Sequence, residues 1–355
     1  MKNLQKKKKK LPVGCSICRC IVYSVLKAFT LAILIILITS SFVSAQTIQK
    51  KGNNLEKRVI ELETEVTRLK KMTNIYSLDG LPETLILCDK KIPIFSDNIR
   101  ERFEREFFQL LEDRGLLTLI VKRYFKYQSM INLETQKMSL PTDLIYLVIT
   151  ESYLNPRAVS RASAAGLWQF MKETGKGEGL QIDDYVDERY NIKKATKSAL
   201  TYLKKMNSDF GDWLLAMAAY NGGPGRVKDA IENQNTKDFF ELFLPQETER
   251  YIFRIMALKE IVLNREAYGI KIDDKDLYKP IIINEIIIET GKDVHVAILS
   301  KCMDEPFKIF RDNNLHLKKY RLPKGTYSIN IPYEKKDIFL KNLKNYNYIK
   351  VVREK

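Results

Sequence analysis

The chain has 355 residues, of which 45% are hydrophobic and 29% charged, so it can hold two or three compact domains and is too apolar to be wholly disordered. Eleven prolines and fifteen glycines exclude a collagen-like chain, and five cysteines are too few for a disulfide scaffold. The net charge of +16 is uneven, because the first 45 residues carry eight Lys and Arg and no Asp or Glu. The moderately basic remainder suits an anionic partner such as nucleic acid or a cell-wall polymer, although a lysine-rich proteome explains it equally well. No nucleic-acid-binding motif is present, so we expect no nucleic-acid partner. With two histidines and no H-E-x-x-H motif, we also expect no metal and no cofactor.

Residues 1–45 have the organisation of an export signal. Five lysines, Lys6 to Lys10, precede an apolar run at residues 28–38, and the small-residue tripeptide Val43-Ser44-Ala45 follows. This order is typical of a signal peptide, here cleaved after Ala45. The alternative is an uncleaved signal anchor, because the uncharged stretch just reaches the shortest length that spans a bilayer. We therefore expect export to the periplasm or cell envelope, with attachment to the inner membrane in the second case.

Residues 46–78 are predicted to form a short coiled coil or spacer helix. Apolar residues recur at alternating spacings of four and three, a short heptad pattern, at Ile48, Leu55, Val59, Leu62, Val66 and Leu69. So short a pattern favours a spacer, and weak self-association through residues 48–72 stays open. Residues 79–139 are expected to be a helical extension, with helices at 98–113, capped by Asp97 or Asn98, and at 116–133.

A helix is predicted from about Pro141 to Ser152. Pro141 suits the first turn of a helix, and Ser139 is a plausible cap. The inward-facing stripe of this helix is formed by Leu144, Leu147 and Val148. The helical region that it opens continues to about residue 263.

Glu151 is the strongest candidate for catalysis. It lies seven residues after Leu144 and three after Val148, which places its carboxylate on the apolar face of the helix. Burial raises the pKa of a carboxyl, and so does the helix end that Asn155-Pro156 predicts nearby. A general acid that works near neutral pH needs such a carboxyl group. If the helix is rotated slightly, however, Glu151 is simply exposed.

Three further segments have residues that suit a binding cleft. Gly166-Leu167-Trp168-Gln169 combines a flexible Gly, a flat ring and an amide, although Trp is more often a core residue. Ala219-Tyr220-Asn221 ends an apolar helical run before a glycine-rich turn that lets the chain reverse. Glu247-Thr248-Glu249-Arg250-Tyr251 opens an amphipathic helix, where ordinary core packing is the simpler explanation of Tyr251.

Together these motifs resemble a known family. The patterns E-S-x-x-x-P (151–156), G-L-W-Q (166–169), A-Y-N (219–221) and E-T-x-x-Y (247–251) occur in the order and spacing of the soluble-type (SLT) lytic murein transglycosylases, and look most similar to the membrane-bound transglycosylase D group. The resemblance implies a mainly α, lysozyme-like catalytic domain at residues 140–265. It implies peptidoglycan strands as substrate, cut at the β-1,4 bond between N-acetylmuramic acid and N-acetylglucosamine without hydrolysis, to leave a 1,6-anhydromuramyl end. Either endo or exo cleavage fits.

The resemblance also assigns roles to individual residues. It implies that Glu151 protonates the leaving oxygen and then acts as base on the muramyl 6-hydroxyl. The other positions that match the motifs are implied to bind substrate or to orient Glu151: Ser152, Gln169, Tyr220, Asn221 and Tyr251. No second acid is compelling, since the acidic residues at 183–188 look like turn and capping residues. A goose-type-lysozyme-like hydrolase would need one of them, and a non-catalytic peptidoglycan-binding scaffold is the other alternative.

Residues 266–355 are expected to form a small α+β unit. The pattern predicts strands at 281–288 and 325–331 and helices at 294–303 and 306–311. This unit resembles a single diverged LysM-like sugar-binding segment, while an ordinary packing or interaction module is an equally good interpretation. It also carries Cys302, and a disulfide with Cys88 stays open.

Overall fold

The computed structural model describes residues 49–66 and 81–354, together with six isolated positions between 27 and 39. The predicted signal segment lies almost entirely outside these residues. The chain divides into two units, Met1–Lys70 and Lys71–Lys355. In the first unit residues 49–66 are helical, and the predicted apolar stripe is exposed there, with Leu55 65% and Leu62 55% accessible. Self-association through this helix remains a prediction. In the described parts of the chain, no helix is both long and apolar enough to cross a membrane.

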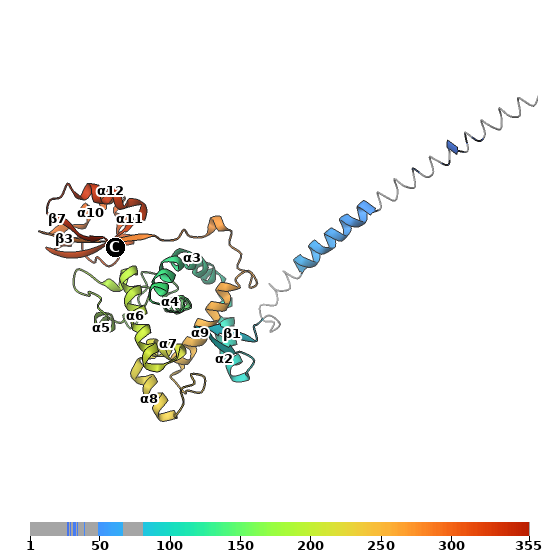
Figure 1. The fold of residues 1–355 in the computed structure, drawn as a ribbon, viewed down its shortest axis with the longest axis horizontal. Coiled ribbons are helices and arrows are strands. Elements are labelled where there is room, and N and C mark those ends of the chain that lie inside the picture. Colours follow the sequence, from blue (N-terminus) through green and yellow to red (C-terminus); the bar gives the residue numbers. More distant parts are fainter. Residues whose placement is uncertain are drawn as a thin grey trace, which may run out of the picture. The chain divides into compact units, whose positions relative to one another are not determined.

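The second unit begins with a mainly α-helical part, as predicted (Figure 1). Its helices are α2 (Asp97–Glu112), α3 (Arg114–Lys137), α4 (Leu144–Ser152), α5 (Lys172–Gly177), α6 (Ile192–Phe210), α7 (Trp213–Gly222), α8 (Pro224–Gln234) and α9 (Gln246–Leu263). A short 3-10 helix, η2 (Glu188–Tyr190), precedes α6. Helix α9 packs against α2, α4 and α7, so it joins both ends of this part.

The expected helical extension at 79–139 also contains an antiparallel hairpin that the sequence analysis did not anticipate. Strands β1 (Thr84–Leu87) and β2 (Lys90–Pro93) pair through a turn in which Cys88 and Asp89 both have positive φ. Two such residues are the hallmark of the tight hairpin turn, for which Asn-Gly or Asp-Gly is the usual signal. The Cys-Asp pair lacks that glycine, so the turn was missed. Helix α2 begins after Ser96 rather than after Asp97 or Asn98.

Helix α4 starts later than predicted, because residues 141–143 form turns before Leu144. Ser139 has φ of +54° and does not cap the helix. The carboxylate of Asp143 accepts the backbone N–H of Cys88 at 2.7 Å and binds the Lys259 ammonium group at 2.8 Å. It therefore ties the start of α4 to the hairpin and to α9. Eight of the nine residues of α4 are buried, so this helix is central rather than amphipathic.

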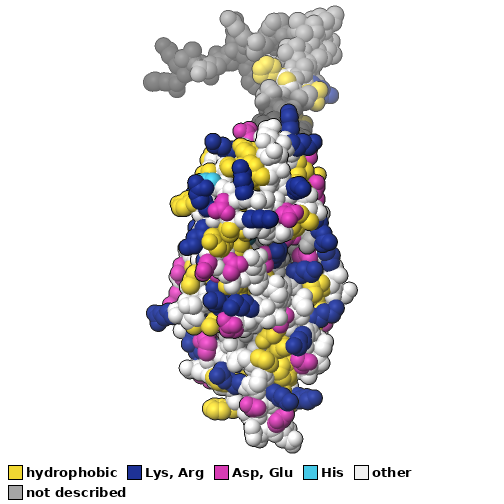
Figure 2. Space-filling view, turned by 90° about the vertical axis from the view of Figure 1, so that its left-hand side faces the viewer, with side chains coloured by type: hydrophobic (Ala, Val, Ile, Leu, Met, Phe, Trp, Pro, Cys, Tyr) yellow, Lys and Arg dark blue, Asp and Glu magenta, His cyan; other side chains and the backbone are white. Residues whose placement is uncertain are grey.

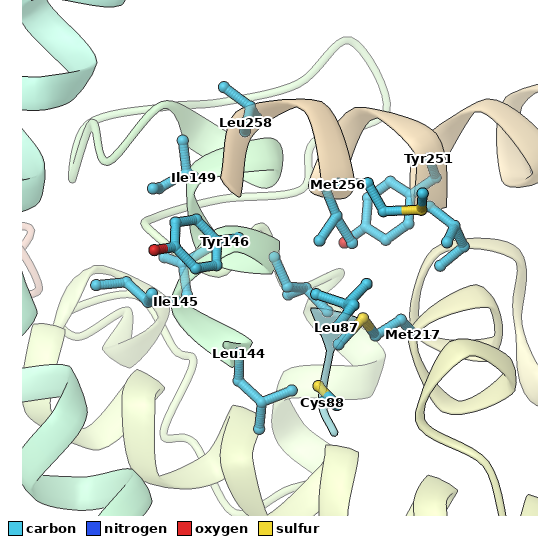
Figure 3. Close-up of a cluster of buried hydrophobic side chains, with 14 of the residues drawn as sticks. Leu87, Cys88, Leu144, Ile145, Tyr146, Ile149, Met217, Tyr251, Met256 and Leu258 are labelled. Carbon is cyan, nitrogen blue, oxygen red and sulfur yellow. The ribbon is translucent and has the colours of Figure 1, made fainter. Parts of the chain in front are cut away.

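The core of this part is formed where α4, α7, α9 and β1 meet (Figure 3). Figure 3 shows Leu87 of β1 and Met217 of α7 close to Met256 of α9. Asp212 caps α7 by accepting the backbone N–H of Leu214 at 2.7 Å. The packing of α9 against α4 and α7 in this core positions the candidate site.

The C-terminal part of the second unit is a small α+β unit, as predicted. Its elements are β3 (Ile283–Thr290), β4 (Val294–His295), α10 (Val296–Met303), α11 (Phe307–Asn313), β5 (Arg321–Leu322), β6 (Gly325–Pro332), α12 (Lys336–Leu343) and β7 (Ile349–Glu354). Strands β6, β3 and β7 form an antiparallel sheet in that order, with the helices on one face (Figure 1). Cys302 and Cys88 are both buried free thiols, so the disulfide left open by the sequence is absent.

The α+β unit is joined to the helical part through the segment before α6. The backbone N–H of Asp187 donates to the carbonyl of His316 at 2.8 Å, and Lys318 donates to the carbonyl of Tyr185 at 2.8 Å. Asn330 of β6 donates to the side chain of Asn191, which also caps α6. Backbone and buried amide contacts of this kind bind the two parts closely.

Candidate active site

Glu151 lies in the last turn of α4, one residue before the helix ends at Ser152. Tyr153 follows in the left-handed region, with φ of +50°, and its N–H donates to the carbonyl of Ile149 at 2.7 Å. The carboxylate accepts a 2.5 Å hydrogen bond from the hydroxyl of Tyr251. Tyr251 is almost fully buried on α9, and Figure 3 shows its ring beside Met256. Two motifs a hundred residues apart therefore meet at one hydrogen bond.

The environment of Glu151 favours its neutral form. Burial raises the pKa of Glu151 from its ordinary 4.5 to about 7, while the Tyr251 hydrogen bond and the charge of Arg254 act against the rise. The neighbouring carboxylate of Glu247 adds to it. A carboxyl with a pKa near neutrality is protonated often enough to give up a proton and basic enough to recover it.

Arg254 and Glu247 are neighbours of Glu151 that the sequence analysis did not assign. Arg254 Nη1 lies 3.3 Å from Glu247 Oε1, and Arg254 Nε lies 3.2 Å from the buried carboxylate of Glu106 on α2. Arg254 follows Tyr251 by three residues, so both lie on one face of α9. That spacing was the available signal. The ion pairs hold the guanidinium where it stabilises the ionised form of Glu151.

Ser152 and Gln169 hold the loop that follows α4. The buried Ser152 hydroxyl donates to the carbonyl of Leu167 at 2.7 Å, which links α4 to the G-L-W-Q segment. The Gln169 amide nitrogen donates to the carbonyls of Gly166 at 2.7 Å and Ala158 at 3.1 Å. Both side chains therefore determine the course of the loop beside Glu151.

Gly166 is required for the close approach of this loop to the segment before α6. Its φ is +80°, and a Cβ there would lie 2.0 Å from the carbonyl oxygen of Arg189. The Arg189 guanidinium in turn donates to the carbonyls of Ser163 at 2.8 Å and Phe170 at 3.1 Å, and pairs with Asp187 at 2.8 Å. Because Asp187 also contacts the α+β unit, that unit supports the G-L-W-Q loop indirectly.

Trp168 of the G-L-W-Q segment lies in the core, whereas the A-Y-N segment lies near Glu151. Trp168 is fully buried and donates to Thr196 Oγ1 at 2.9 Å, so it is a core residue and not a cleft wall. The Tyr220 hydroxyl, at the end of α7, donates to the Trp168 carbonyl at 2.7 Å. Burial raises the pKa of Tyr220, and the negative charge of Glu151 raises it further. Asn221 follows in the same helix turn and is partly exposed.

Three of the acidic residues before α6, Asp183, Asp187 and Glu188, have structural partners. Asp183 accepts the backbone N–H groups of Tyr185 at 2.7 Å and Val186 at 2.8 Å. Glu188 is buried, accepts the N–H of Gln181 and pairs with Lys194. These contacts agree with turn and capping roles. Among residues 49–66 and 81–354, no group of three or more His, Cys, Asp and Glu side chains is arranged to hold a metal ion.

Residues 128–243 match the family model described as the transglycosylase SLT domain. This range includes Glu151, Gln169 and Tyr220, whereas Tyr251 follows it. The resemblance that the motifs indicated is thus confirmed.

Two curated relatives show how far the similarity extends. The membrane-bound lytic murein transglycosylase D of Escherichia coli (strain K12) is 36% identical over 186 residues, which are 51% of this chain and 40% of that protein. The peptidoglycan transglycosylase gp16 of Escherichia phage T7 is 40% identical over 93 residues, which are 25% of this chain and 7% of that protein. The chain therefore spans about two fifths of the length of the transglycosylase D that it matches.

Among solved structures, the 70 kDa soluble lytic transglycosylase SLT70 of Escherichia coli is 22% identical with a TM-score of 0.31. The matched region covers 42% of this chain and 26% of that one. A lytic transglycosylase Slt from Pseudomonas aeruginosa, solved as an inactive variant, gives the same identity and TM-score.

Proposed function

We propose that the protein is a lytic transglycosylase of peptidoglycan, because residues 128–243 match the model of the transglycosylase SLT domain. It cleaves the β-1,4 bond between N-acetylmuramic acid and N-acetylglucosamine. The observation that carries this proposal is the single carboxyl of Glu151, which has a pKa of about 7 and a short hydrogen bond from Tyr251. The names of the relatives, which refer to murein and peptidoglycan, support the substrate class.

In the proposed reaction Glu151 acts twice. The neutral carboxyl first donates its proton to the glycosidic oxygen of the departing sugar, as the bond from that oxygen to the anomeric carbon breaks. The resulting carboxylate then accepts the proton of the muramyl 6-hydroxyl, whose oxygen bonds to the same anomeric carbon. The product is a 1,6-anhydromuramyl end, and no water is consumed. The enzyme ends the cycle protonated, as it began.

The neighbours of Glu151 have distinct proposed roles in this cycle. Tyr251 orients the carboxylate and stabilises its ionised state after the first proton transfer. Arg254 stabilises the same state from further away, so the pKa does not rise beyond the useful range. Ser152 and Gln169 keep the loop in place, and Tyr220 and Asn221 contact the sugars.

A hydrolase is the alternative that the chemistry must exclude. Two-carboxylate glycosidases need a second carboxylate, which either activates a water molecule as a base or attacks the anomeric carbon as a nucleophile. Asp183 is occupied by two backbone N–H groups, which supports a one-carboxylate mechanism. Export to the envelope is part of the same proposal, because the substrate lies there.

The test is mass spectrometry of the fragments that the purified protein releases from peptidoglycan. Fragments lighter by one water than the hydrolytic product are expected, and they should be absent with Glu151→Gln. Ordinary reducing ends would identify a hydrolase instead. Binding without any release of fragments would leave a non-catalytic scaffold.

A further inference from the structure

A cleft lies between the helical part and the α+β unit, next to the end of α4. It has a volume of about 480 Å³. Helix α3 and the loop that follows α4 line one side, and α11 with the residues after it lines the other. Leu154, three residues after Glu151, belongs to its wall. The size is that of a site for a small molecule or a short peptide.

The charged residues of this cleft are mainly basic. Four cationic side chains line it, Arg123, Lys126, Arg157 and Lys308, against the single carboxylate of Asp312. Arg157 and Lys308 both pair with Asp312, so one carboxylate serves two cations. On the face drawn in Figure 2, by contrast, basic and acidic side chains are intermixed. A concave surface with one sign of charge concentrates ions of the opposite sign.

Lys126 has a charge that no carboxylate of the cleft neutralises by direct contact. Its ammonium group lies 5.4 Å from the centroid of the Tyr127 ring, and within the described residues it forms no ion pair. Burial lowers the pKa of Lys126, and the negative charge of Asp312 offsets this only in part. Arg123, one turn earlier on α3, adds a like charge. A partly buried cation in this situation favours an added anion.

The cleft is mechanically connected to the candidate active site. Arg123 Nη1 donates to the carbonyl of Tyr153 at 2.9 Å, directly after α4. Residues 155–157 of the cleft wall lead into Ala158, whose carbonyl binds Gln169. The wall of the basic cleft and the loop held by Gln169 are therefore parts of one continuous segment that begins at the end of α4.

We infer that this cleft binds a carboxylate of the peptide that substitutes the glycan strand. The inference rests on the proposed function, because peptidoglycan carries such peptides on its muramyl residues, close to the bond that is cut. Arginine and lysine donors suit a carboxylate, and the exposed ring of Tyr278 adds apolar surface for side chains of the peptide. The α+β unit then contributes to substrate choice in two ways. Lys308 lines the cleft directly, and Asp312 holds the guanidinium of Arg157 in place.

The test is a calorimetric binding measurement with the full chain carrying Glu151→Gln, so that no cleavage occurs. The two probes are a soluble glycan fragment that bears its peptides and the same fragment after their removal. In this background Lys126→Met, which keeps the aliphatic stem, should weaken binding of the first probe about tenfold and leave the second unchanged. The control is Lys205→Met, an exposed lysine on α6 outside the cleft, which should change neither. Unchanged melting temperatures confirm that both variants are folded.

Three outcomes would overturn the inference. Equal weakening of both probes would make Lys126 a general glycan contact, and no weakening of either would leave the cleft without a role. Competition by inorganic phosphate, with no preference for the peptide-bearing probe, would assign the cleft to a phosphate polymer. Failure of the proposed function is recognised separately by mass spectrometry of the products of the unmodified protein, because a hydrolase or a non-cleaving scaffold would still bind the probes.

Discussion

The half-buried carboxyl of Glu151 should make the protein less stable than it would be with a neutral side chain. Its pKa in the folded state is about 7, mainly because burial disfavours the charge, against an ordinary value of 4.5. Replacing Glu151 by Gln keeps the size of the side chain and an oxygen that accepts the Tyr251 hydroxyl. The variant should therefore be more stable at alkaline pH and inactive.

The size of the effect depends on pH in a defined way. A pKa raised from 4.5 to about 7 corresponds to up to about 3 kcal/mol, since each pKa unit is worth about 1.4 kcal/mol. Below pH 4.5 the carboxyl is neutral in both the folded and the unfolded state, so the variant gains nothing. Between pH 4.5 and 7 only the unfolded state ionises freely and the penalty grows. Above pH 7 the penalty is complete and constant.

The assay is urea unfolding of the unmodified protein and Glu151→Gln at about pH 4 and about pH 8. We expect equal free energies of unfolding at the lower pH and a gain of up to about 3 kcal/mol for the variant at the higher pH. Glu101→Gln, an exposed position on α2, is the control and should change stability at neither pH. A Glu151→Gln variant that is no more stable than the unmodified protein at pH 8 would refute the argument that burial raises this pKa.

Three further predictions concern other parts of the second unit. Tyr251→Phe removes a hydrogen bond that lowers the pKa of Glu151, so the alkaline limb of the kcat/KM profile should move up by about one pH unit. Gly166→Ala should destabilise the fold by at least about 3 kcal/mol, measured by urea unfolding, because its Cβ would meet the carbonyl of Arg189 at 2.0 Å. Burial lowers the pKa of His316 to about 4, so the unmodified protein should lose up to about 3 kcal/mol as the pH falls from 6.5 to 4, and His316→Gln should lose less.

Each of these variants has a comparison that makes the result decisive. Tyr333→Phe, at an exposed tyrosine, should leave the pH profile in place, and an equal shift in both variants would contradict the role of Tyr251. Gly225→Ala is the control for Gly166→Ala, because no atom lies within 4 Å of the Cβ that it adds. The Gly166→Ala variant should be far less stable than the Gly225→Ala variant. For His316→Gln, thermal melting against pH is the measurement, and an acid sensitivity equal to that of the unmodified protein would show that His316 does not titrate with unfolding.

Local sequence patterns were sufficient for much of the helical part. The predicted helices at 98–113 and 116–133 correspond to α2 (Asp97–Glu112) and α3 (Arg114–Lys137), because helix-forming residues and apolar periodicity act over a few residues. The hairpin at Thr84–Pro93 was missed, since its turn lacks the usual glycine and its strands have only four residues each. In the α+β unit, α12 and β7 were also missed, because short elements carry little periodic signal.

The helix-face argument for Glu151 does not hold for the helix that the structure shows. The argument relied on an apolar stripe, yet α4 is buried on nearly every side, so no stripe distinguishes one face. What singles out Glu151 is that it is a half-buried carboxyl in a helix whose other eight residues are all buried. The sequence shows that contrast in residue type, and the order of the four motifs makes it specific.

The sequence by itself determined the helical character, the family motifs and Glu151 as the candidate acid, because these depend on residue type and short spacing. Only the tertiary structure decided that Tyr251 donates to Glu151, that Arg254 lies near it, and that a basic cleft forms beside α4. These features need segments a hundred or more residues apart to pack together. The pKa of Glu151 follows from the water that this packing removes, and no local pattern encodes the loss of solvent.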